Sequence, residues 1–92
     1  MTTARVILTS APTPETVSRV RALLVFAALC AVGNAAATRG VYDPADVSRR
    51  AEAMVTRMVD ALAHARPVAV SEAHMVAAAI RTAGGTCDVV PA

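Results

Sequence analysis

Apolar and polar residues alternate with a helical period in three segments of the chain, and the first segment is the longest. Thr13 is a favourable N-cap residue, and Pro14 suits the first position of a helix. Gly40 suits the left-handed turn that often ends a helix. The pattern therefore predicts a helix over residues 14–38, about 37 Å long at the standard rise per residue.

Two shorter helices are predicted further along the chain. Asp43 and Pro44 supply the N-cap and the first position of a helix over residues 44–65, whose apolar residues recur at i, i+4 and i+7. Ser71 is the expected N-cap of a third helix over residues 72–83. Together the three segments predict a mainly α protein, built as a small three-helix bundle.

Extended segments are predicted at both ends of this bundle. The chain reads as one small helical domain over residues 1–92, with an extended arm at 1–12, the bundle at 13–83 and an extended tail at 84–92. In an up-down-up bundle the two extended segments start from opposite ends. We therefore expect them to pair with each other only if one folds back; otherwise each would add to a sheet edge of a neighbouring chain.

The second half of the first predicted helix is apolar all round. No charged residue occurs from Ala22 to Thr38, and side chains such as Leu24, Phe26 and Leu29 point in different directions around the helix. Two shorter helices cannot surround a helix of this length, so part of its apolar surface would stay bare. Bare patches of this kind mark interaction sites, and we expect another protein surface to cover this one.

The sequence therefore predicts a small non-enzymatic structural or accessory subunit. It would dock onto a larger protein assembly, such as a viral or phage particle or a bacterial complex, or associate with itself. An intracellular or particle-bound location is favoured over a membrane or secreted one. The predicted interface residues are Val25, Phe26, Leu29 and Val32 on the helix, and Val6, Ile7 and Leu8 on the arm.

The same apolar segment has two other interpretations, a single membrane span and an export signal. Its 17 uncharged residues at 22–38 fall short of the roughly 20 that a span needs, and arginines flank both ends. Arg19 and Arg21, followed by an apolar run and Ala35-Ala36-Ala37, match the order of an export signal. The region before that run is unusually long for a signal, so a membrane or exported protein is the alternative prediction.

Composition changes the picture of the core and of the partners. Hydrophobic residues make up 55% and charged residues 17%, which excludes a disordered chain. However, 22 residues are Ala and 14 are Val, so each buried side chain removes little surface from water, and association with another chain would compensate for the thin core.

The net charge of +2 comes with scattered arginines, which disfavours nucleic-acid binding. A helix-turn-helix regulator, reading DNA with Arg81, is the second alternative.

The reactive side chains of the chain follow no catalytic or metal-binding spacing. Cys30 lies in the apolar helix, where we expect it to serve as packing. His64 and His74 fall on the outward faces of their helices, and no Cys-x-x-Cys or His-x-x-x-His pattern occurs. We therefore predict no catalytic residue, no cofactor and no metal site. A disulfide between Cys30 and Cys87 stays open.

Overall fold

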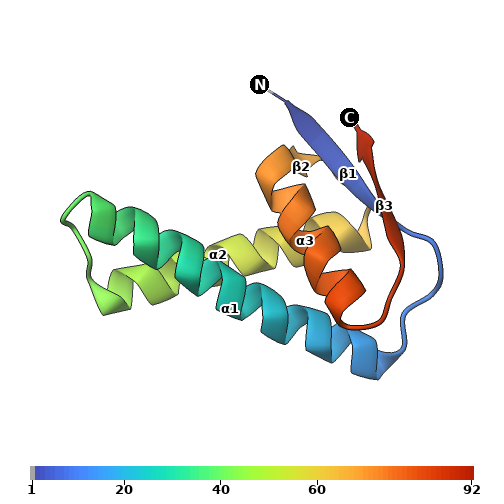
Figure 1. Ribbon diagram of the computed structural model, residues 1–92, viewed down its shortest axis with the longest axis horizontal. Helices are drawn as coiled ribbons and strands as arrows, with labels where there is room; N and C mark the ends of the chain where they lie inside the picture. The colour runs from blue at the N-terminus through green and yellow to red at the C-terminus, as the bar shows by residue number, and fades with distance from the viewer. Residues whose placement is uncertain (1) are drawn as a thin grey trace.

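Three helices and a three-stranded antiparallel sheet make up the computed structural model, which describes residues 2–92. The sheet lies at one end of the molecule, and α1 and α2 extend away from it as a long antiparallel pair (Figure 1). In chain order the elements are β1 (Thr3–Leu8), α1 (Pro14–Thr38), α2 (Pro44–Ala63), β2 (Val68–Ala69), α3 (Val70–Thr82) and β3 (Cys87–Pro91).

The three predicted helices are confirmed, with differences at three of their ends. The first has the predicted bounds, and the second ends two residues early because the backbone at Ala65 turns to a φ of 49°. The third begins at Val70, ahead of the expected cap Ser71, and ends at Thr82 rather than at residue 83. Its early start follows from β2, which pairs with β1 and runs directly into the helix without a side-chain cap.

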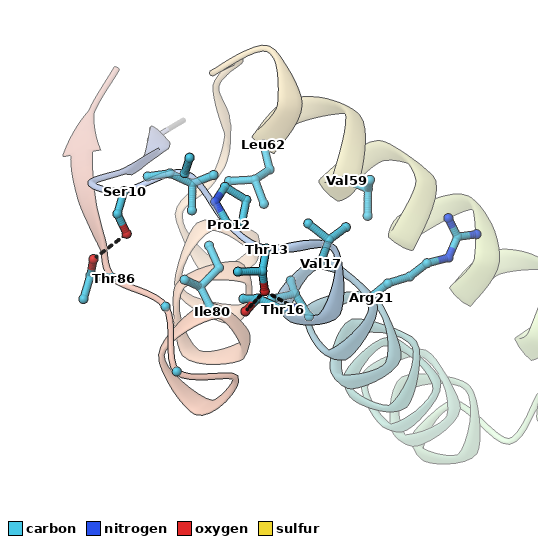
Figure 2. A pocket seen from close by; sticks show the side chains of 15 residues that line it. Ser10, Pro12, Thr13, Thr16, Val17, Arg21, Val59, Leu62, Ile80 and Thr86 are labelled. Atoms are coloured by element: carbon cyan, nitrogen blue, oxygen red, sulfur yellow. Dashed lines mark hydrogen bonds between the residues drawn. The ribbon is translucent and has the colours of Figure 1, made fainter.

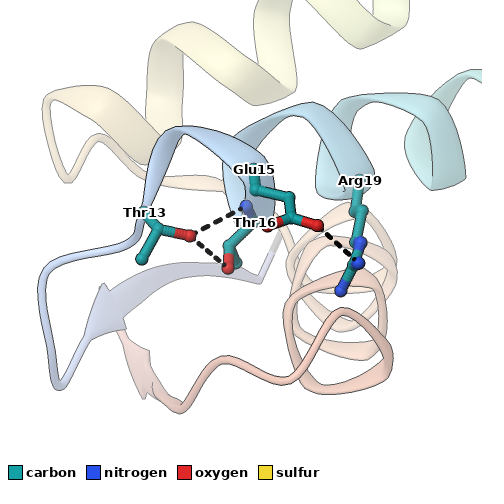
Figure 3. Close-up of polar contacts among 4 residues, drawn as sticks. All are labelled: Thr13, Glu15, Thr16 and Arg19. Atoms are coloured by element: carbon teal, nitrogen blue, oxygen red, sulfur yellow. Dashed lines mark hydrogen bonds and ion pairs between the residues drawn. The ribbon is translucent and has the colours of Figure 1, made fainter.

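The N-terminus of α1 is fixed by local polar contacts, as Figure 3 shows. The backbone N–H of Thr16 donates to Thr13 Oγ1 at 3.1 Å, and Arg19 forms an ion pair with Glu15 at 2.7 Å. The hydroxyl of Thr13 thus satisfies one of the backbone donors that every helix leaves unpaired at its start. These contacts set where the helix begins.

Removal of this cap is expected to destabilise the protein measurably. Thr13→Ala should lower the free energy of unfolding by about 1 kcal/mol, because a backbone N–H of α1 loses its acceptor. Ser18→Ala, at an exposed position within the same helix, is the control and should leave stability equal or slightly higher. Urea unfolding followed by circular dichroism measures both. A Thr13→Ala variant as stable as the Ser18→Ala variant would contradict the capping role.

The extended ends are strands of one sheet, so of the two arrangements left open by the sequence the chain adopts the one in which the arms pair with each other. β1 is the central strand, and it pairs antiparallel with β2 and with β3, in a register from Ala4 opposite Pro91 to Leu8 opposite Cys87. The two ends of the chain therefore lie side by side (Figure 1). The up-down-up path fails because α3 packs against both α1 and the sheet and returns the chain to β1.

The core lies where α1, α2 and α3 meet the inner face of the sheet. Its largest fully buried side chains are Leu24, Met58 and Ile80, one from each helix. On α1 the inward residues repeat every four positions, which is the ridge that packs into the groove of a neighbouring helix. These inward residues are Val20, Leu24, Ala28, Val32 and Ala36.

Candidate protein-binding surface

A second apolar row on α1 is left uncovered by the rest of the chain. Phe26 is 71% exposed, and Val25 and Leu29 are exposed beside it. Ala22 and Cys30 are exposed as well, which gives the spacing i, i+3, i+4, i+7 and i+8 of a single helix face. We call these five residues the α1 stripe. α1 is thus apolar on two faces, and the fold uses only one of them.

Three of the four predicted interface residues on the helix lie on this surface. Val25, Phe26 and Leu29 are exposed, whereas Val32 is half-buried and packs against the core. Val32 belongs to the inward row of α1, which repeats every four positions along the helix. The exposed apolar surface of α1 is therefore narrower than the sequence pattern implied, since it does not include Val32.

The predicted interface residues of the arm are placed differently. Val6 is only 5% exposed and Leu8 is half-buried against the core, since alternate residues of β1 share its inner face. Only Ile7 reaches the outer face of the sheet, where it is 37% exposed. In this fold the three residues cannot act together as a binding arm.

The loop between α1 and α2 extends the apolar surface, which sequence reasoning missed. Val41 and Tyr42 are both exposed there, and Tyr42 is 56% exposed. The ring of Tyr42 lies over Gly33, where an added Cβ would be 3.5 Å from the ring carbon Cε2. Gly33 continues the spacing of the α1 stripe, so Tyr42 covers the next position of that face. The signal that the sequence offered for this extension was an aromatic residue soon after the end of the first predicted helix.

A groove of about 240 Å³ follows the junction of α1 and α2 beside the α1 stripe. Its apolar residues are Val25, Leu29, Ala51 and Val55, and its polar residues are Arg21, Ser48, Glu52 and Thr56. Arg21 and Glu52 carry opposite charges, yet neither forms an ion pair within residues 2–92. The groove therefore presents one uncompensated cation and one uncompensated anion to a partner.

A second recess, of about 250 Å³, lies where the loop after β1 meets the three helices (Figure 2). Its walls are mainly apolar, with Val17, Val59, Leu62 and Ile80 around it. Its lining includes no His, Cys, Asp or Glu, so it offers no acid, base or nucleophile of those kinds. Arg21 lines both this recess and the groove, so the two hollows meet at its side chain.

The reactive side chains do not converge in the described structure. Cys87 is buried and Cys30 is exposed, and both are free thiols, so the expectation that Cys30 serves as core packing is wrong. The side chain of Cys30 lies on the face of α1 that α2 and α3 leave open. His64 and His74 are exposed, as predicted. Within residues 2–92, no group of three or more His, Cys, Asp or Glu residues could hold a metal ion.

The length and apolar composition of α1 would also allow it to cross a membrane. In this fold, however, it supplies inward residues such as Leu24 and Ala28, which are fully buried against the other elements. A membrane-spanning α1 would have to give up these contacts. The fold therefore accounts for one face of α1, and its exposed face is what a partner would have to cover.

Comparison with known proteins assigns the chain to no family. No family model matches it, and neither a curated protein nor a solved structure is detectably similar to it.

Proposed function

We propose that the chain is a small non-enzymatic subunit that binds another protein surface through the α1 stripe and so joins a larger assembly. One observation carries the proposal: both aromatic side chains of the chain, Phe26 and Tyr42, are exposed. A domain with so few large side chains gains most by burying them, because an aromatic ring removes more surface from water than Ala or Val. Exposed aromatic residues on a rigid element are typical anchors of protein interfaces.

The distribution of charge around the stripe supports the same function. The stripe itself carries no charge, while Arg19 and Arg21 lie next to its N-terminal end. An uncharged apolar centre with a polar rim is the usual anatomy of a protein interface. Such a chain suits the role of a structural or accessory component of a viral or phage particle, or of a bacterial complex.

The alternative is a single-span or exported protein, favoured by the length and composition of α1 alone. It predicts that the chain sediments with membranes, or that its N-terminal sequence in the native host begins after the apolar run. The docking proposal predicts instead a full-length chain in detergent-free extracts. A DNA-reading regulator has less support, because the guanidinium of Arg81 donates to the Cys87 carbonyl at 3.3 Å and is partly committed within the fold.

Phe26→Asp tests the proposal directly. The variant should elute as the free chain from detergent-free extracts of the native host, whereas the wild type should elute within a larger assembly of defined composition. Loss of a central aromatic anchor weakens an interface by about 2–4 kcal/mol, which corresponds to at least roughly 30-fold in affinity. The helix content by circular dichroism should be unchanged, because this side chain does not contribute to the core.

Ala53→Asp provides the matched control for that experiment. Ala53 is exposed on α2 outside the groove, so the substitution introduces the same charge at a helical position away from the stripe. It should elute with the wild type. Equal elution of Phe26→Asp and the wild type would show that the α1 stripe is not the binding surface.

A further inference from the structure

We infer that the surface covering the α1 stripe is a second copy of this chain, packed with its α1 antiparallel about a two-fold axis near Val25. The inference rests on the proposed function, because it assumes that the stripe binds protein and names the partner. In a two-fold interface each residue contacts the same surface on the other copy, so the surface has to be complementary to itself. The groove beside the stripe has this property.

The positions of the two uncompensated charges follow from the packing of α1 on α2. An added Cβ at Gly33 would lie 3.8 Å from the side chain of Val47, so these two residues are level with each other. Because the two helices run antiparallel (Figure 1), Glu52 is level with residue 28 of α1. Arg21 and residue 28 are seven positions apart, which is roughly 10 Å along the helix.

The midpoint between these two levels falls between positions 24 and 25, next to Val25, which is an exposed residue of the groove itself. A two-fold axis there exchanges the two levels. It places Arg21 of one copy at the level of Glu52 of the second copy, and Glu52 at the level of the other Arg21. Each charge that lacks a partner within the described chain thereby meets the opposite charge, and two such pairs form at once.

The N-terminal half of the stripe faces itself across the same axis, while Leu29 lies near the level of Arg21 of the second copy. Val25 would lie next to its own copy, and Phe26 lies close enough to the midpoint for the two rings to pack against each other. Ala22 has a small side chain that allows the helices to approach closely. Arg19 and Arg21 of the second copy lie at the level of the charge-free run, so no like charges face each other along the two α1 helices. Antiparallel α1 helices also align opposite ends of their dipoles.

Complementary charge reversals separate a second copy from any other partner. Wild-type protein should show a mass approaching twice 9.4 kDa by light scattering as its concentration rises. Arg21→Glu and Glu52→Arg should each weaken the dimer by about tenfold or more, because two attractive pairs become two repulsive ones. Arg5→Glu, which reverses an exposed arginine that lies outside the groove and forms no ion pair within residues 2–92, is the control and should keep the dimer.

A mixture of the two reversed chains gives the sharper result. Each variant alone should be largely monomeric, but a mixture should form heterodimers, since glutamates at 21 and 52 on one chain face arginines at 21 and 52 on the other. The double variant R21E/E52R should also regain the dimer. Charges that acted only within one chain would not respond to mixing, so the mixture isolates the contact between copies.

The outcomes also separate this inference from the proposed function. A wild type that stays at 9.4 kDa at millimolar concentration, or reversed chains that stay monomeric when mixed, would overturn the second-copy inference. If the second-copy inference fails in this way but the Phe26→Asp variant still dissociates from its assembly in the native host, the stripe binds a different protein and the proposed function stands. If Phe26→Asp changes neither the mass by light scattering nor the elution from native extracts, the proposed function and the second-copy inference both fail.

Discussion

Leu24→Ala should lower the free energy of unfolding by about 2–5 kcal/mol, whereas Leu29→Ala should lower it by less than about 1 kcal/mol. The two leucines lie on the same helix, and the same atoms are removed in each case. They differ in surroundings, because Leu24 is 0% exposed in the core and Leu29 is 38% exposed on the α1 stripe. The comparison therefore measures which face of α1 the fold uses.

The cost at Leu24 is large because the core has few side chains of its size. Leu24, Met58 and Ile80 are its largest fully buried members, and most of their neighbours are Ala and Val. Such neighbours cannot close over the cavity that Leu24→Ala leaves, so the lost contacts add to the lost burial. For a domain of this length the whole free energy of unfolding is only about 5–14 kcal/mol, so the variant should be marginally folded.

Urea unfolding of both variants is best measured in a Phe26→Asp background. Association would stabilise the folded state and make the midpoint depend on protein concentration, and this background removes that contribution. Equal destabilisation by the two substitutions would contradict the orientation of α1 in the core. It would favour the membrane interpretation, in which neither face of α1 packs on α2 and α3.

The helices could be predicted because their signals are local. Thr13 with Pro14, and Asp43 with Pro44, each place an N-cap and a first helical residue in adjacent positions. The exposed apolar face was also predictable, since the helix is apolar in directions that two shorter helices cannot cover. Its exact edge was not, because the partial burial of Val32 depends on how α1 packs against the rest of the chain.

The sheet and the charged groove depend on contacts between distant parts of the chain. Thr3–Leu8 and Cys87–Pro91 are each short, and nothing in either segment specifies the other as its partner. β2 has only two residues, too few for any periodic pattern. Arg21 and Glu52 become neighbours in one groove only through the relative alignment of α1 and α2, which the spacing within each helix does not fix.

Val6→Lys should abolish folding, and Ile7→Lys should leave the protein folded. The two residues are adjacent in β1, but Val6 faces the core at 5% exposure and Ile7 faces outward at 37% exposure. A lysine at position 6 would bury an unpaired charge, with an expected cost of about 4 kcal/mol or more, which is close to the whole stability at the lower end of the range for a domain this size. A lysine at position 7 would lie opposite Asp88, where opposite charges across a strand pair are mildly favourable.

Circular dichroism and thermal unfolding of the two variants distinguish a central strand from a free arm. If residues 3–8 were an arm that latches onto a neighbour, both lysines would leave the isolated chain folded and both would weaken its association. If β1 is the middle strand of the sheet, only the Val6 variant unfolds, because only that side chain closes the core beneath α3. The second result would exclude the N-terminal segment as a binding arm, since that segment is then already used in holding the two ends of the chain together.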